Sequence, residues 1–218
     1  PLLRETGLVG VLNLSYAEHA HAWRRNGHQV ESLPVEALSA AVDRLDVLAL
    51  VHPNNPTAAR FPLNLLLDWR SQLAARGGWL VVDEAFIDAT PAESLANYAG
   101  LPGLIVLRSL GKFFGLAGVR VGFVLSGPAL LESLREQLGP WSLSGPSRWV
   151  ATQTLIDCDW QEKTRVGLRR LGERLAELLR RQRLPVADGT ALFQWAPMAE
   201  AEFWQDALAR RGILVRRF

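Results

Sequence analysis

The fold of this chain is decided by one stretch, SLGKFFGLAGVRVGF, at residues 109–123. It contains Lys112, one of only two lysines among the chain's 24 lysines and arginines. An apolar run at residues 104–107 precedes it and predicts a buried strand. Apolar, glycine-rich surroundings bring the backbone close to a ligand and desolvate an amine, which makes it reactive toward carbonyl compounds. Taken alone, however, a lysine after a strand is equally well explained as a solvated loop residue.

The composition is that of a globular protein with a sizeable core, 49% apolar and 21% charged over 218 residues. This length suits one large domain, or one domain and part of another. A net charge of +2 gives no case for nucleic acid. The single Cys158 excludes an internal disulfide and suits the reducing cytoplasm. No apolar run approaches the roughly 20 residues that span a membrane.

Short apolar runs alternate with amphipathic segments along the first 146 residues. Such alternation, with runs that are apolar throughout, predicts an α/β fold whose mostly parallel sheet is covered by helices on both faces. The expected strands are Val9–Leu14, Val30–Leu33, Val47–Val51, Trp79–Val82, Leu104–Leu107 and Val121–Leu125. The expected helices are Tyr16–Gly27, Val35–Leu45, Leu63–Arg76 and Pro128–Leu138.

A long helical pattern occupies residues 147–183, with a break expected near residues 157–159. Its arginines could contact nucleic acid, but leucines at 168, 171, 175, 178 and 179 predict a buried stripe and therefore a solvated basic face. The segment 184–195, a helix at 200–211 and a strand at 213–218 predict the start of a smaller α+β domain. We therefore expect a large domain at 1–146, and a connecting helix with a partial small domain at 147–218.

The two ends of the sequence also carry an expectation. The chain begins at Pro1 without a methionine, and it ends at Phe218 within a run that predicts a strand. We therefore expect a fragment of a longer protein.

Three polar residues follow three different predicted strands. Asn55, Asp83 and Lys112 each come just after the end of an apolar run. In parallel sheets ligands collect at the carboxyl ends of the strands, so these side chains should share one site. Asp83 should be largely buried, and a buried carboxylate needs a cationic or hydrogen-bonding partner. Considered one at a time, these residues also have simpler explanations. Asp83 could cap a turn, residues 54–57 could form an ordinary turn, and Arg120 could be a surface cation.

Together these motifs resemble the fold-type I pyridoxal-phosphate enzymes, the class I/II aminotransferase family. The matching pieces are PNNPT at 53–57, DEAF at 83–86, Ser109-x-x-Lys112, Arg120 eight residues later and Gly-Phe at 122–123. Their order and intervals match the family, and the resemblance covers essentially the whole chain. It implies the fold-type I architecture, with a partial small C-terminal domain, and pyridoxal 5'-phosphate as cofactor.

The resemblance assigns three residues to the reactive part of the cofactor. Lys112 would bind it covalently as a Schiff base and then move protons at the α-carbon of the substrate. Asp83 would pair with the pyridine nitrogen and keep it protonated, so that the ring accepts electrons. Asn55 would donate a hydrogen bond to the ring hydroxyl oxygen.

It assigns three more residues to the remainder of the cofactor. Ser109 and Arg120 would bind the phosphate, the arginine through its charged fork. Tyr16 aligns with the aromatic residue that stacks on the ring in the histidinol-phosphate branch. A packing residue at a helix start is the alternative for Tyr16. No metal is implied.

Within the family the chain looks most like the threonine-phosphate decarboxylases of cobalamin biosynthesis. Phe86 stands where the related aminotransferases usually have a tyrosine, and Gly111 where they usually have a serine. The passages at 83–91 and 139–146 also look like those decarboxylases. This implies decarboxylation of L-threonine O-3-phosphate to (R)-1-amino-2-propanol O-2-phosphate. The arginine for the substrate carboxylate and the ligands for the substrate phosphate would lie outside this chain.

Other functions stay open on the sequence. The main alternative is a histidinol-phosphate-type aminotransferase, and a second is the aminotransferase-like domain of a transcription regulator, which would need a basic DNA-binding module. A cofactor-free relic is disfavoured by the intact Lys112, Asp83, Asn55 and Arg120. The resemblance also implies a cytoplasmic homodimer acting on a phosphorylated amino acid, without nucleic-acid or membrane partners.

Overall fold

The computed structural model describes residues 6–218, so the start of the chain at Pro1 lies outside it. Its centre is a six-stranded sheet in the order β2-β1-β3-β4-β5-β6. The first five strands are parallel, and β6 is antiparallel to β5. The strands are β1 (Leu8–Leu12), β2 (Gln29–Leu33), β3 (Val47–Val51), β4 (Trp79–Asp83), β5 (Leu104–Ser109) and β6 (Gly122–Leu125).

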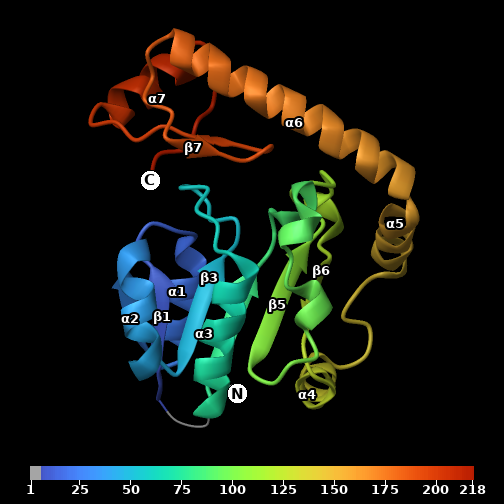
Figure 1. The fold of residues 1–218 in the computed structure, drawn as a ribbon. Helices are drawn as coiled ribbons and strands as arrows, with labels where there is room; N and C mark the ends of the chain where they lie inside the picture. The colour runs from blue at the N-terminus through green and yellow to red at the C-terminus, as the bar shows by residue number, and fades with distance from the viewer. Residues whose placement is uncertain (1–5) are drawn as a thin grey trace.

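Helices cover both faces of the sheet, which confirms the predicted fold class (Figure 1). On one face, Leu48 and Leu80 pack with Leu66 and Leu73 of α3 (Leu63–Ala75) in the larger apolar cluster. On the other, the buried valines of the same strands pack with Trp23 of α1 (Ala17–Arg25) and with residues of α4 (Pro128–Leu138). Strands buried on both faces need apolar residues at every position, as the sequence shows.

The predicted helix at 35–45 is a series of three short turns instead. A 3₁₀ turn (Val35–Ala37), the short helix α2 (Leu38–Ala41) and a second 3₁₀ turn (Val42–Arg44) follow one another. β-Branched residues at both 3₁₀ turns lower helix propensity, which accounts for the irregularity. The apolar spacing was nevertheless informative, because Leu38, Ala41, Val42 and Leu45 are all buried in the core.

The end of α3 and the start of β4 meet at two glycines. Gly77 has φ +75°, in the left-handed region that stops a helix. A Cβ on Gly78 would lie 2.5 Å from the carbonyl oxygen of Asp46, so only glycine fits there. This close approach aligns the entry of β4 with that of β3, and so brings the opposite ends of the two strands to the same sheet edge.

The C-terminal third lies across the carboxyl ends of the strands (Figure 1). It comprises α5 (Gly145–Ile156), α6 (Cys158–Arg181), the short strands β7 (Asp188–Gly189) and β8 (Gln194–Trp195), and α7 (Ala201–Ala209). The predicted helix break is confirmed at Asp157, whose side chain accepts a hydrogen bond from the Trp160 backbone at 3.0 Å and caps α6. The boundary at residue 146 stays a prediction.

Two predictions for this third were wrong. Leu171, Leu175 and Leu178 are about half exposed, and the buried residues of α6 are Gly172 and Ala176. Small residues are needed there because the turn between β7 and β8 packs directly on the helix: a Cβ on Gly172 would lie 3.2 Å from the Thr190 carbonyl oxygen. Residues 213–218 form no strand, since no neighbouring strand pairs with them among the described residues.

The sequence contains no apolar run long enough to predict a membrane span. Within residues 6–218, none of the helices combines the length and the apolar character required to cross a bilayer.

Candidate active site

All six predicted site residues line a single cavity of about 420 Å³ at the carboxyl edge of the sheet. The loops after β1, β3, β4 and β5, and the segment before β6, each contribute to it. The residues are Tyr16, Asn55, Asp83, Ser109, Lys112 and Arg120. Parallel strands bring loops from distant parts of the chain to the same edge, which is why the sequence spacing was informative.

Asp83 is held by a histidine that the sequence did not single out. Its Oδ2 lies 2.9 Å from Nε2 of His19 on α1, and its Oδ1 accepts a hydrogen bond from the Ala85 backbone at 2.9 Å. The Asp83 side chain is only 18% exposed, so the predicted burial and the predicted need for a partner both hold. His19 follows Tyr16 by three residues, and this spacing places both side chains on one side of the helix start. The spacing was the signal in the sequence that could have pointed to His19 as a site residue.

The loop after β3 contains two asparagines with different tasks. Asn54 is fully buried, and its Nδ2 donates to the Leu14 carbonyl at 2.9 Å and to Thr57 Oγ1 at 2.7 Å. Its Oδ1 accepts from Ser15 Oγ at 2.6 Å. Asn54 therefore joins this loop to the loop that carries Tyr16. Asn55 is half-buried and lines the cavity, where its amide is available to a ligand.

The Lys112 loop turns its aromatic residues away from the cavity. Ser109 Oγ accepts a hydrogen bond from the Gly111 backbone at 3.0 Å, which tightens the turn before Lys112. Phe113 and Phe114 are buried in a separate apolar cluster. Because those rings turn inward, Lys112 is exposed, and the expectation of a desolvated amine was wrong. Its Nζ lies over the ring of Phe86, 5.4 Å from the ring centre.

Arg120 and Arg216 also line this cavity. Arg120 has φ +57°, a left-handed conformation that is uncommon for a long side chain and that concentrates at functional sites. Its Nη1 donates to the Ala117 carbonyl at 3.3 Å. Arg216, in the segment after α7, also lines the cavity. The sequence did not single out Arg216, because nothing distinguishes it from its neighbour Arg217.

A buried ion-pair network lies directly beneath the site, between the ends of β4 and β5. Glu84 is fully buried, and its carboxylate accepts from Ser94 Oγ and from the Leu95 backbone, both at 2.6 Å. Arg108 lies 3.4 Å from Glu84 and also pairs with Asp88. Burial raises the pKa of both carboxyl groups, although Arg108 opposes the shift at each. The network therefore fixes the residues that adjoin Asp83 and Ser109.

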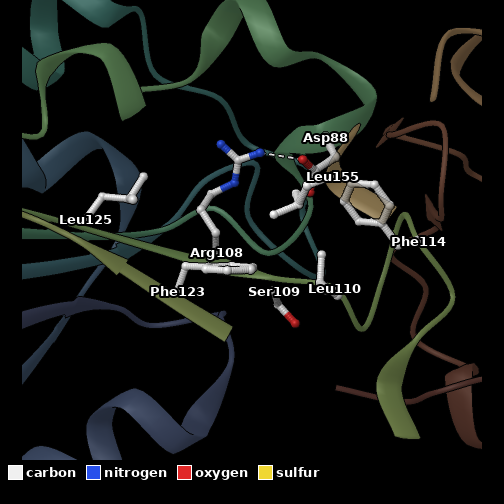
Figure 2. Close-up of a pocket in the computed structure, with 8 residues that line it drawn as sticks. All are labelled: Asp88, Arg108, Ser109, Leu110, Phe114, Phe123, Leu125 and Leu155. Atoms are coloured by element: carbon white, nitrogen blue, oxygen red, sulfur yellow. Dashed lines mark hydrogen bonds and ion pairs between the residues drawn. The ribbon is translucent and has the colours of Figure 1, made fainter. Parts of the chain in front are cut away.

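The network borders the cavity at β5, because Arg108 belongs to the network and also lines the cavity. Figure 2 shows Arg108 and Ser109 on opposite sides of the strand, with Arg108 directed to Asp88. A second cavity, of about 240 Å³, adjoins the network and has a mostly apolar lining that includes Phe114, Phe123 and Leu155. Ser109 therefore lines the cavity of about 420 Å³, while the guanidinium of its neighbour Arg108 pairs with the buried carboxylate of Asp88.

Comparison with known proteins identifies the family to which the chain belongs. The family described as aminotransferase class I and II matches residues 4–218, so the chain belongs to that family. It is similar to a histidinol-phosphate aminotransferase of Sinorhizobium meliloti solved in complex with pyridoxal-5'-phosphate, with a TM-score of 0.86 over 99% of this chain and 63% of the other. At 22% identity, this likeness shows the fold alone.

The sequence is more similar to two decarboxylases. It is 52% identical over 218 residues to a threonine-phosphate decarboxylase of Pseudomonas aeruginosa, covering all of this chain and 66% of that protein. It is 36% identical over 215 residues to a threonine-phosphate decarboxylase of a Sinorhizobium species, covering 96% of this chain and 62% of the other. The chain thus spans slightly less than two thirds of the length of these relatives.

Proposed function

We propose that the full-length protein is an enzyme that binds pyridoxal 5'-phosphate in the cavity around Lys112 and decarboxylates L-threonine O-3-phosphate. The convergence of Lys112, Asp83 and Arg120 on one cavity is the observation that carries the cofactor assignment. The 52% identity to a threonine-phosphate decarboxylase supports the choice of substrate. The product is (R)-1-amino-2-propanol O-2-phosphate, and its use in cobalamin biosynthesis is part of the proposal.

The donor set of the cavity fits this cofactor. Asp83, oriented by His19, presents a carboxylate to a protonated ring nitrogen, and Asn55 presents an amide to the ring hydroxyl. Arg120 and Ser109 are the ligands for the phosphate. Tyr16 is 44% exposed at the rim, so its ring is free to cover a planar ligand. When bound, the cofactor supplies an electron sink for the carbanion left by a broken bond at the α-carbon.

The protein's own residues then position the substrate and move one proton. In the reaction the bond between the α-carbon and the carboxylate breaks, CO₂ leaves, and a proton takes its place. Lys112, which lines the cavity with its amine over the ring of Phe86, is the donor of that proton. Arg216 is a further cation that lines the cavity, and we assign it to an anionic group of the substrate. Phe86 offers no hydroxyl where the related aminotransferases usually have one.

A histidinol-phosphate-type aminotransferase is the alternative function, and the fold shared with such enzymes supports it. In that case a C–H bond at the α-carbon breaks instead, and the amino group passes to a 2-oxo acid. The choice depends on which bond at the α-carbon the substrate-binding groups would align for cleavage. The aminotransferase-like domain of a transcription regulator is the second alternative.

Assembly and location complete the proposal. Trp141 and Trp149 are 89% and 65% exposed on and beside the connection between α4 and α5. Large exposed aromatic residues are typical of subunit interfaces, and they support the predicted homodimer. The cytoplasmic location that Cys158 suggests stays a prediction.

The test measures both reactions on the full-length protein. We expect CO₂ release from L-threonine O-3-phosphate, its loss in Lys112→Ala, and its retention in the control Lys163→Ala. Glutamate formed from 2-oxoglutarate and histidinol phosphate, without CO₂ release, would overturn the decarboxylase assignment in favour of the aminotransferase.

A further inference from the structure

A short turn from the C-terminal third contacts Phe86, one of the residues that line the cavity. It joins β7 to β8 at residues 190–193 and is closed by Thr190, which is buried. The Thr190 backbone donates to the Phe193 carbonyl at 2.8 Å, and its Oγ1 accepts from the backbones of Leu192 and Phe193 at 3.0 and 3.3 Å. These three hydrogen bonds fix the direction in which Phe193 leaves the turn.

The turn is held from two sides. Gln194 Nε2 donates to the Gly172 carbonyl of α6 and to the Thr190 carbonyl, both at 3.2 Å. On the other side, Arg60 Nη2 donates at 3.2 Å to the carbonyl of Gly189. Arg60 belongs to the loop that carries Asn55, so the turn is anchored both to a helix and to the site.

Phe193 continues this contact to the reactive amine. Its ring meets the ring of Phe86 at 5.2 Å between centres and 78°, an edge-to-face arrangement. Lys112 Nζ lies over the ring of Phe86 at 5.4 Å. Edge-to-face pairs have a preferred orientation, and an ammonium is attracted to the face of an aromatic ring. The three side chains thus form a continuous series from the turn to the amine.

We propose that Phe193 is a positioning residue for Lys112: it holds the ring of Phe86 so that the ring face stays beside the amine. The inference rests on the proposed role of Lys112. Without the contact with Phe193 the Phe86 side chain gains rotational freedom, and the amine of Lys112 loses the ring face over which it lies. The other charged groups lining the cavity are Asp83, Arg108, Arg120 and Arg216, and none of them takes part in the contact between Phe193 and Phe86.

The consequence is a change in the reactivity of the amine. An amine held against a ring face has to leave that face to attack an aldehyde. An attraction of about 0.5–1 kcal/mol between the amine and the ring therefore slows the attack two- to fivefold. Phe193→Ala therefore makes Lys112 react two to five times faster at neutral pH, and Phe86→Leu has the same effect.

The experiment uses the full-length protein freed of bound cofactor. Pyridoxal phosphate is added with cyanoborohydride at pH 7, and the initial rate of labelling of the Lys112 peptide is followed by mass spectrometry. The variants are Phe193→Ala, Phe86→Leu and the two combined. Phe203→Ala is the matched control, because this phenylalanine of α7 is 66% exposed and distant in sequence from the site loops. Phe193→Tyr, which keeps the ring edge, should behave like the wild type.

A positioning role predicts that the combined variant reacts no faster than Phe86→Leu alone. Rates that multiply in the combined variant, or a wild-type rate in Phe193→Ala, would overturn the inference. If Phe193→Ala does not fold, Phe193→Leu provides the same test with most of the volume kept. Absence of any label on Lys112 in the wild type would instead refute the proposed function, so the two failures are distinguishable.

Discussion

Stability in acid should depend on His52, the first residue after β3. The side chain is fully buried: Nδ1 accepts a long hydrogen bond of 3.4 Å from the Phe61 backbone, and Nε2 has no partner among residues 6–218. Burial lowers the pKa of His52 from 6.5 to about 4. A protonated imidazolium at this position would be a buried charge without a carboxylate partner in the described part of the chain.

The sign of the effect follows from this direction. Because the folded-state pKa lies below the unfolded value, the contribution to stability is complete above pH 6.5 and is lost as the pH falls toward about 4. A shift of this size corresponds to about 3 kcal/mol in full, of which about 2.5 kcal/mol is lost between pH 7.5 and pH 4.5. Glu84 and Asp88 act in the opposite direction, since their raised pKa values favour the folded state as the pH falls.

The assay therefore compares two proteins, so that the carboxylates cancel. His52→Asn keeps an acceptor for the Phe61 backbone and does not titrate. We expect the variant to be less stable than the wild type at pH 7.5, and the difference in unfolding free energy to move by about 2–3 kcal/mol in its favour at pH 4.5. Urea unfolding of the full-length proteins measures it. A difference that stays constant with pH would refute the reasoning.

Three further predictions concern the site and its support. Arg108→Met leaves Glu84 and Asp88 without their cation and should reduce the unfolding free energy by about 3 kcal/mol, measured by urea unfolding; unchanged stability contradicts the network's role. His19→Phe removes the partner of Asp83 and should weaken pyridoxal-phosphate binding about tenfold in a fluorescence titration, with equal affinity as the contrary result. Gly111→Ser places a Cβ 3.2 Å from Ser109 Oγ and should weaken cofactor binding while costing less than about 1 kcal/mol of stability. Wild-type affinity in that variant would contradict the predicted effect of crowding Ser109 at the phosphate position.

The sequence predicted the strands and the meeting of Asn55, Asp83 and Lys112, because apolar runs of strand length are distinctive and parallel strands end at a common edge. It did not predict His19 against Asp83, a contact between residues 64 positions apart. The three-residue spacing between Tyr16 and His19 was the one local signal, and it does not identify Asp83 as the partner. The contact of Phe193 with Phe86 was missed for the same reason.

Periodicity also left open what covers an apolar face. The leucines of α6 have helical spacing, yet Leu171, Leu175 and Leu178 remain about half exposed, while Gly172 carries the closest packing. The run at 213–218 has the composition of a strand, but a strand requires a neighbour with which to pair. Composition reports what a segment is able to bury, and the neighbouring segments decide whether it does so.

The central claim is that Lys112 is the residue that carries the cofactor. The full-length protein is loaded with pyridoxal phosphate, reduced with borohydride and digested, and the labelled peptide is identified by mass spectrometry. Lys163, the second lysine of this chain, provides the internal control. We predict a pyridoxyl group on Lys112 and none on Lys163. A label on Lys163 instead, or a loaded protein whose Lys112 peptide stays unmodified, would contradict it.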